Sequence, residues 1–244
     1  MANNITPYKD SELGKKEQVA QMFDTISEEY DGLNRVISFG IDIKWRDKVI
    51  EYVANSNPEK VLDIATGTGD LALLMAERTQ AKEIIGLDIS AGMLAVGKRK
   101  IAEKNWTNKI QMVQADSENM PYADDYFDAI TVSFGVRNFE NLQKGLTEIL
   151  RVLKPNGVFV ILETSVPTKF PFKQGYGIYS KFILPTIGKL FSKDKVAYQY
   201  LSDSANKFPF GQELNNILQE TGFIDVSHEP QTFGVATIYK ASKK

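Results

Sequence analysis

Short apolar runs alternate with stretches of helical periodicity through the middle of the chain. The runs are KVLDIA, EIIGLDI, KIQMVQAD, FDAITVSF and GVFVILE, and most are separated by helical segments, namely DLALLMAERT, SAGMLAVGKRKIAEK and LQKGLTEILRVL. This strand–helix alternation predicts a parallel sheet with right-handed crossovers. The runs are apolar throughout instead of alternating with polar residues, as expected for strands that are covered on both faces.

Helical periodicity also marks the N-terminal part of the chain, after a loose tail over residues 1–10. Apolar residues recur at a helical spacing within residues 12–30, and a second helical stretch at about 41–54 ends in the breaker cluster NSNP. We interpret about 11–55 as an N-terminal helical lid on a single domain that spans residues 1–244.

Residues 164–209 break the rhythm of strand and helix, and we interpret them as a helical insertion. The chain then predicts a helix near 211–220, a strand near 223–228 and a last strand near 232–240. Because only the short link EPQ separates these two strands, we expect a hairpin, which makes the last strand antiparallel. The remaining parts of the domain are a ligand-binding core of about 60–163 and a C-terminal helix and hairpin of about 210–240.

The composition excludes several kinds of chemistry. The chain has no cysteine and one histidine, His228, so thiol nucleophiles, disulfides, Cys-type zinc sites and multi-histidine metal sites are excluded, and we expect no metal. Its 29 basic and 31 acidic residues argue against nucleic-acid binding, which needs a basic excess. The first residues show no apolar signal-peptide region and no apolar run could cross a bilayer, so we expect a cytoplasmic protein with His228 at its surface.

The sharpest local signal is the segment VLDIATGTGD at residues 61–70. It predicts a strand, a tight turn at Gly67 and Gly69, and a helix whose first backbone N–H groups are free to meet a ligand. Asp88 follows nineteen residues after Gly69, at the end of the next strand. An acid at that place is positioned to accept hydrogen bonds from both ribose hydroxyls of an adenosine.

The glycine loop alone leaves two ligands open. Residues 67–72 satisfy the dinucleotide pattern G-x-G-x-x-A, so an NAD-binding oxidoreductase is an alternative. Asp63 lies four residues before Gly67, and its negative charge suits a ligand with an ammonium group better than a pyrophosphate. The third strand ends in polar residues at 114–117 that suit an adenine edge, and a terminal hairpin is typical of class I methyltransferases. These features favour S-adenosylmethionine.

Three further segments carry a more specific signal. They are YDGLNRVIS at 30–38 with Trp45 beyond it, SFGVRN at 133–138, and RVLKPNG continuing to LETS within 151–165. Together they resemble the signatures of the ubiquinone/menaquinone biosynthesis C-methyltransferase family, which belongs to the class I S-adenosylmethionine-dependent methyltransferases. The resemblance extends over about 18–240.

The first of these segments departs from the family pattern, Y-D-x-M-N-x-x-[apolar]-S-x-x-x-H-x-x-W, at two positions. Leu33 stands where the family usually has methionine, which is a mild apolar exchange. Asp42 stands where the family usually has histidine, so any role of a histidine at that place is lost in this chain.

The resemblance implies an α/β fold of the class I methyltransferase (Rossmann-like) type: a seven-stranded, mostly parallel sheet with an antiparallel last strand and helices on both faces. It implies methylation of a ring carbon of a prenylated hydroquinone, either demethylmenaquinol or the benzoquinol of the ubiquinone pathway. Alternatives are a methyltransferase for another small phenol or lipid, and a non-catalytic dimeric scaffold. The family's contacts to S-adenosylmethionine fall on Thr68, Asp88, Asp116, Ser117 and Ser133, and Asp63, Gly67, Gly69 and Ile89 complete the expected cofactor site.

The implied reaction needs a group that stabilises a phenolate, because a ring carbon becomes nucleophilic when a neighbouring hydroxyl, with an ordinary pKa of about 10, is ionised. We expect Arg137 in this role, assisted by Asn138 and Tyr30, since a guanidinium stays protonated. The structural alternatives are an ion pair at the end of a strand for Arg137 and a half-buried lid aromatic for Tyr30.

The insertion combines basic and aromatic residues. Residues 164–202 contain six lysines against one acid, Asp194, with aromatic and aliphatic side chains between them. Such a segment can settle on an anionic lipid surface, which suits a prenylated substrate, so peripheral contact with the inner face of a membrane through 169–195 is one expectation. A cover over the substrate pocket and a homodimer contact are the alternatives.

Overall fold

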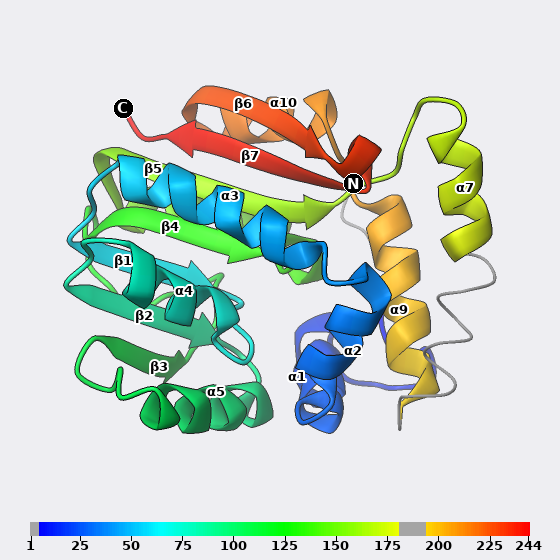
Figure 1. The fold of residues 1–244 in the computed structure, drawn as a ribbon, viewed down its shortest axis with the longest axis horizontal. Helices are drawn as coiled ribbons and strands as arrows, with labels where there is room; N and C mark the ends of the chain where they lie inside the picture. The colour runs from blue at the N-terminus through cyan, green and yellow to red at the C-terminus, as the bar shows by residue number, and fades with distance from the viewer. Residues whose placement is uncertain (1–4, 181–193) are drawn as a thin grey trace.

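The computed structural model describes residues 5–180 and 194–244 and contains one seven-stranded sheet in the order β3-β2-β1-β4-β5-β7-β6 (Figure 1). The strands are β1 (Lys60–Ile64), β2 (Glu83–Asp88), β3 (Ile110–Gln114), β4 (Phe127–Ser133), β5 (Leu153–Thr164), β6 (Ile224–Gln231) and β7 (Ala236–Ser242). Every pairing is parallel except the two pairings of β7, which runs antiparallel to both β5 and β6. The predicted sheet is confirmed, including its antiparallel last strand.

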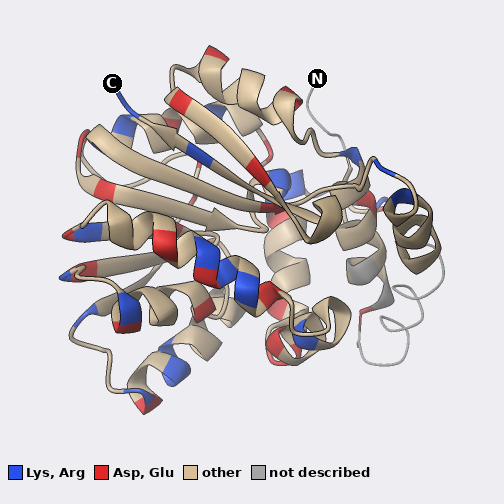
Figure 2. Cartoon of the chain, turned by 45° about the horizontal axis from the view of Figure 1, so that its top comes forward, with Lys and Arg blue, Asp and Glu red and all other residues tan. Residues whose placement is uncertain are grey.

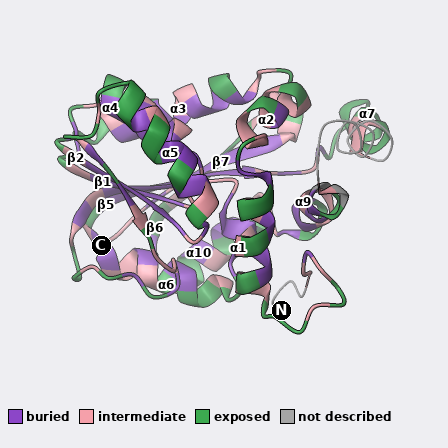
Figure 3. Cartoon of the chain, turned by 90° about the horizontal axis from the view of Figure 1, so that it is seen from below, coloured by how far each residue is buried: buried purple, intermediate pink, exposed green. Residues whose placement is uncertain are grey.

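Helices cover both faces of this sheet. The helices of the described residues are α1 (Lys15–Ile26), α2 (Tyr30–Ser38), α3 (Asp42–Asn55), α4 (Asp70–Arg78), α5 (Ala91–Glu103), α6 (Leu142–Val152), α7 (Phe172–Ile178), α9 (Lys195–Lys207) and α10 (Gln212–Thr221), with short 3-10 turns η1 (Val136–Asn138) and η3 (Thr232–Gly234). Figure 3 shows α3, α4 and α5 on one side of the buried strands, and α6 and α10 on the other.

Two apolar cores hold these layers together, because each face of the sheet removes apolar surface from water. One core joins the sheet to α3, α4 and α5, and fully buried Val49 and Leu71 belong to it. The other core joins the sheet to α6 and α10 through Leu146 and Leu214. Basic and acidic residues are interleaved along the exposed side of α3 (Figure 2), in keeping with the balanced composition.

A third apolar cluster lies beside the carboxyl ends of the parallel strands. Met22 of α1 and Leu33 of α2 pack there with Met93 of α5, and Tyr200 of α9 joins them. Figure 1 shows α1, α2 and α9 together at this end of the sheet. Within the segment expected to form the lid, α1 and α2 lie over the strand ends, and much of α3 packs on a face of the sheet.

Two local features differ from the sequence prediction. The helical stretch expected to reach Tyr30 ends at Ile26, and Tyr30 opens a separate helix, α2. The link EPQ is part of β6, and the reversal comes later, at Thr232, Phe233 and Gly234, all with positive φ. The last strand therefore begins at Ala236 and not near residue 232, because the left-handed turn and not the proline ends β6.

Candidate active site

The glycine loop lies at the carboxyl end of β1 and leads directly into α4. Gly67 and Gly69 have φ of 58° and 77°, in the left-handed region that favours glycine. Gly69 is the N-cap of α4 and packs closely: an added Cβ would lie 3.4 Å from the Cε of Met112. The predicted turn at these glycines is therefore present and opens toward the neighbouring strand ends.

Asp88, at the end of β2, is joined to this loop. Its Oδ2 accepts a hydrogen bond from the backbone N–H of Gly67 at 2.8 Å, and its Oδ1 accepts from the N–H of Ser90 at 2.9 Å. Burial raises the pKa of the Asp88 carboxyl above its ordinary value. Each oxygen still has acceptor capacity for a second donor, so the carboxylate can meet hydroxyl groups of a ligand.

A cavity opens over the ends of β1, β2, β3 and β4 beneath α1. Among the residues expected to bind a cofactor, those that line the cavity are Gly67, Asp88, Ile89, Asp116, Ser117 and Ser133. The Ser133 hydroxyl is buried and has no hydrogen-bond partner within the described residues. An orphaned buried hydroxyl on a cavity wall fits a site in which a bound molecule supplies the missing partner.

Asp63, Thr68 and Gly69 do not line this cavity: Thr68 and Gly69 belong to the loop itself, and Asp63 lies before it in β1. The Asp63 carboxylate accepts from the hydroxyls of Thr66 at 2.6 Å and Thr131 at 2.7 Å. Burial raises the pKa of Asp63 to about 6. The structure thus places Asp63 as a buried support of the loop.

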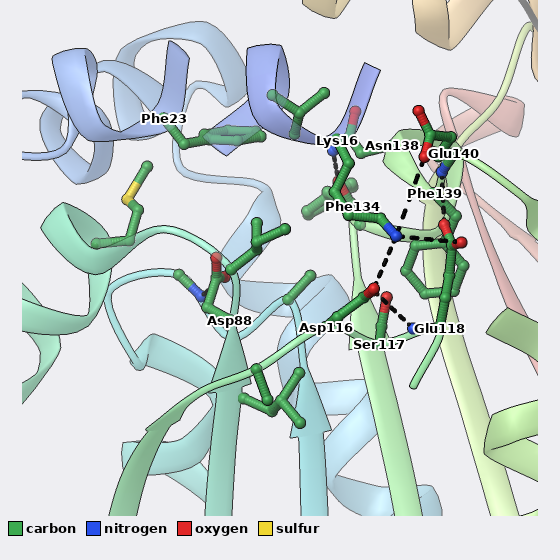
Figure 4. A pocket seen from close by; sticks show the side chains of 18 of the residues that line it. Lys16, Phe23, Asp88, Asp116, Ser117, Glu118, Phe134, Asn138, Phe139 and Glu140 are labelled. Atoms are coloured by element: carbon green, nitrogen blue, oxygen red, sulfur yellow. Dashed lines mark hydrogen bonds and ion pairs between the residues drawn. The ribbon is translucent and has the colours of Figure 1, made fainter. Parts of the chain in front are cut away.

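The roof of the cavity contributes a residue that the sequence analysis missed. Lys16 of α1 reaches across to the end of β3, with its Nζ 2.7 Å from Oδ2 of Asp116 and 3.4 Å from Oε2 of Glu118 (Figure 4). No local pattern distinguishes Lys16 from its neighbour Lys15, since the pairing joins positions a hundred residues apart. The contact fastens α1 over the strand ends.

A second cavity adjoins the first, and Tyr30 and Phe134 line both. Its wall is largely aromatic and apolar, but it also contains two arginines, Arg46 and Arg137. The other lining residues are Asn34, Ile37, Ser38, Asp42, Trp45, Thr164, Tyr176, Tyr179, Leu201, Ser202, Ala205 and Val235.

Arg137 lies in η1, directly after β4, and is buried. Its NH1 donates to Oε1 of Glu163 at 2.5 Å and to the carbonyl of Phe134 at 2.7 Å, while its Nε has no partner within the described residues. Asn138 lines the first cavity, and its Oδ1 accepts from the Tyr200 hydroxyl at 3.1 Å. Arg137 and Asn138 therefore face two adjoining cavities from one short turn.

Tyr30 stands at the boundary between the two cavities. Its ring packs edge to face against Phe23, with 5.9 Å between ring centroids. Burial raises the pKa of the Tyr30 hydroxyl, so the group stays protonated and can donate a hydrogen bond. His228, by contrast, lines neither cavity; it is partly buried in β6, with Nδ1 2.9 Å from the Asn215 amide nitrogen.

Within residues 5–180 and 194–244, no group of three or more acidic or histidine side chains could hold a metal ion. Over the same ranges, no helix has both the length and the apolar character that a bilayer crossing requires.

The fold defines the class of protein. The chain superposes on the cyclase SpnF with a TM-score of 0.70 at 17% identity, covering 95% of this chain and 97% of that one. It superposes on a SAM-dependent methyltransferase from Thermotoga maritima with a TM-score of 0.64 at 18% identity, covering 92% and 99%. The chain therefore has the class I methyltransferase fold, and because one of these neighbours is a cyclase, the fold alone does not fix the activity.

The sequence defines the family. The chain belongs to the ubiE/COQ5 methyltransferase family, which it matches over residues 11–243. It is 47% identical to a demethylmenaquinone methyltransferase of Bacteroides fragilis, covering 98% of this chain and 97% of the relative. It is 45% identical to the ubiquinone/menaquinone biosynthesis C-methyltransferase UbiE of Geobacter sulfurreducens, covering 98% and 93%. The resemblance inferred from the sequence segments is confirmed, and the oxidoreductase alternative loses its support.

Proposed function

We propose that the protein transfers a methyl group from S-adenosylmethionine to a ring carbon of a prenylated hydroquinone in quinone biosynthesis. One observation carries the proposal: a cavity of polar strand ends adjoins an aromatic cavity with a buried arginine, and Tyr30 and Phe134 line both. The names of the relatives favour demethylmenaquinol as the acceptor, with the benzoquinol of the ubiquinone pathway as the second candidate.

The first cavity is suited to hold the methyl donor. Asp88 would accept from the ribose hydroxyls, Asp116 and Ser117 would meet the adenine edge, and the unpartnered hydroxyl of Ser133 would gain a partner. When bound, S-adenosylmethionine supplies a methyl group on a cationic sulfur, and methyl transfer leaves a neutral thioether. The remaining expected cofactor residues line the cavity or support its loop: Gly67, Ile89, Asp63, Thr68 and Gly69.

The second cavity is suited to hold the acceptor ring. Arg137 stabilises the phenolate that makes the ring carbon nucleophilic, because its guanidinium stays protonated at any working pH. The protonated Tyr30 hydroxyl helps to orient the ring, and the Asn138 side chain, which lines the first cavity, assists from the donor side. The new carbon–carbon bond would form as the carbon–sulfur bond breaks, and the proton on the methylated carbon would then pass to water, which restores the aromatic ring.

Exclusion of water favours this reaction, because an anion and a cation react to give two neutral groups. We infer that α1 and α2 act as the lid, with Phe23 and Tyr30 covering the boundary between the cavities. The insertion contributes Tyr176 and Tyr179 to the wall of the acceptor cavity. The chain thus works as one domain whose lid and insertion cover a shared reaction space.

Methyl transfer is tested directly with the purified protein. Labelled S-adenosylmethionine is supplied with reduced demethylmenaquinone or with the demethylated benzoquinol, and label in the quinone is measured. We expect incorporation with the naphthoquinol and tight binding of S-adenosylmethionine, but not of NAD, by calorimetry. No incorporation with either ring, despite donor binding, would contradict the proposed acceptor class.

We also propose that residues 169–195 contact a membrane peripherally. The described part of this segment exposes Phe170, which is 80% accessible, and Ile178, which is 59% accessible. Residues 181–193, which carry three of the lysines, lie outside the described residues. Aromatic and basic groups together bind anionic lipid interfaces, where a prenylated substrate resides.

Vesicle co-sedimentation tests the membrane proposal. We expect Phe170→Ser with Ile178→Ser to reduce binding to vesicles that contain anionic lipid, and Val196→Ser, an exposed apolar control on α9, to leave it unchanged. Sedimentation velocity without lipid tests the alternative that this segment forms a homodimer contact. In that case the double variant would have a different mass in solution from the parent protein. Equal binding of all variants would contradict the proposal.

A further inference from the structure

Glu163, at the end of β5, is an acid that the proposed reaction has not yet used. It is 1% exposed and lies against both the side chain and the main chain of Arg137. Its Oε1 accepts from NH1 of Arg137 at 2.5 Å and from the N–H of Thr164 at 2.8 Å. Its Oε2 lies 3.4 Å from the backbone nitrogen of Arg137.

A buried ion pair of this kind is not explained by stability alone. Removing two charges from water has a large desolvation cost, and apolar residues of similar volume often stabilise a fold as well or better. One member of the pair, Arg137, also lines the proposed acceptor site. A role in positioning Arg137 accounts for both features.

The hydrogen bonds of Arg137 indicate what is being positioned. Glu163 and the carbonyl of Phe134 both use NH1, so the guanidinium is fixed in one orientation. The Nε–H is buried and has no partner within the described residues. A buried donor without a partner is unfavourable, and a ligand oxygen in the cavity would supply the missing acceptor.

We propose that Glu163 is a positioning residue for methyl transfer: it orients the guanidinium of Arg137 toward the acceptor and offsets part of its charge, which sets how readily the bound phenol ionises. This inference rests on the proposed function. Without the carboxylate, Arg137 would present an uncompensated positive charge, and a neighbouring phenol would ionise at lower pH. A phenolate stabilised too strongly is a weaker nucleophile toward the methyl group.

Several other titratable groups face Arg137 from the elements packed around it. Tyr30 of α2, Tyr176 of α7 and Tyr200 of α9 interact with its charge, and burial raises the pKa of each hydroxyl, that of Tyr200 to about 12. The Nζ of Lys15 donates to the Arg137 carbonyl at 3.2 Å, and burial lowers the pKa of Lys15 to about 8. These groups remain in a Glu163 variant, so a difference in the ionisation of a bound phenol between variant and parent reports on Glu163 alone.

The test compares the parent protein with Glu163→Gln and Glu163→Asp. The pKa of bound 1-naphthol, a phenol probe that needs no turnover, is measured by absorbance, and the pH profile of kcat/KM is measured with the quinol. For Glu163→Gln we expect both the naphthol pKa and the acidic limb of the profile to move down by about one unit. We expect kcat to fall at least tenfold, the donor Kd to stay within about twofold, and Glu163→Asp to restore part of the activity.

The outcomes separate the two proposals. A naphthol pKa that stays unchanged in Glu163→Gln, in protein that still binds the donor and unfolds cooperatively, would overturn the role of Glu163. If Glu163→Gln does not fold, Glu163→Asp provides the test, because a shortened carboxylate must shift the naphthol pKa in the same direction by a smaller amount. A parent protein that shifts the naphthol pKa but methylates no quinol would instead contradict the proposed function.

Discussion

Thr68 in the glycine loop donates a hydrogen bond to Asp31 of α2, with 2.6 Å between Oγ1 and Oδ1. Lys100 of α5 joins both residues, with its Nζ 3.2 Å from the Thr68 hydroxyl and 2.8 Å from Oδ2 of Asp31. Asp31 is the neighbour in sequence of Tyr30, which lines both cavities. The loop proposed to hold the donor is thus tied to the helix proposed to cover the acceptor.

Loss of the hydrogen bond between Thr68 and Asp31 should affect both donor binding and turnover of the acceptor. Thr68→Val keeps the shape of the side chain but removes the hydroxyl, so we expect α2 to pack less firmly on the loop. The expected result is a donor affinity and a kcat each reduced about fivefold, with a free energy of unfolding lowered by about 1 kcal/mol. Calorimetry, steady-state kinetics and urea unfolding measure the three quantities.

A matched control comes from an exposed contact on α3. Glu51 pairs with Lys48 at 3.1 Å on the surface, where such pairs contribute little, so Glu51→Gln should change none of the three quantities. If Thr68→Val behaves like this control, the hydrogen bond to Asp31 does not couple the loop to α2.

Arg137 should control turnover far more than donor binding. Arg137→Ala leaves Glu163 as an uncompensated buried charge, which we expect to lower the free energy of unfolding by about 3–5 kcal/mol. Arg137→Lys keeps the charge but loses the planar donor geometry, and it is the better kinetic variant. For Arg137→Lys we expect kcat at saturating substrates to fall at least a hundredfold, with the Kd for the donor within a few-fold of the parent value. Weak donor binding with surviving turnover would instead make Arg137 a cofactor or structural residue.

Ser133 offers a test that separates binding from stability. Because its buried hydroxyl has no partner within the described residues, Ser133→Ala should leave the free energy of unfolding unchanged or slightly higher. If the donor supplies the missing partner, the same change should weaken donor binding about fivefold, the value of one neutral hydrogen bond. Calorimetry and urea unfolding of one variant check both expectations. An unchanged donor affinity would remove Ser133 from the cofactor site.

The parts of the site that could be predicted from sequence are those fixed by local geometry. Gly67 and Asp88 come together because parallel strands end at one edge, and strand ends can be read from apolar runs. Lys16 and Glu163 escaped prediction because their partners, Asp116 and Arg137, lie far away in sequence and only tertiary packing pairs them.

The helix α2 escaped prediction for a different reason. It has nine residues and ends at Ser38, where the C-cap residue Phe39 adopts a left-handed conformation before Gly40. A helix of this length is stabilised mainly by packing against its neighbours, so its sequence alone does not establish it as a separate helix. The last hairpin was misplaced because Phe233, a residue type uncommon at positive φ, makes the turn.

Asp63 should make the stability of the protein depend on pH in an unusual direction. Burial raises its pKa from an ordinary 3.8 to about 6, so the folded protein takes up this proton at a higher pH than the unfolded chain does. The contribution of Asp63 to folding is therefore most favourable below pH 3.8 and is lost as pH rises through 6. Since one pKa unit corresponds to about 1.4 kcal/mol, the difference across this range is about 3 kcal/mol.

Asp63→Asn isolates this effect from the other acids of the protein. The amide keeps a hydrogen-bonding group between Thr66 and Thr131 but cannot titrate. Urea unfolding of both proteins is measured from pH 4 to pH 8, and the free energy of the parent is subtracted from that of the variant. We expect this difference to grow in favour of the variant by about 2 kcal/mol between pH 4 and pH 7, because only the parent must bury a charge at the higher pH. A difference that stays constant across the range would mean that Asp63 has the same pKa in the folded and unfolded states.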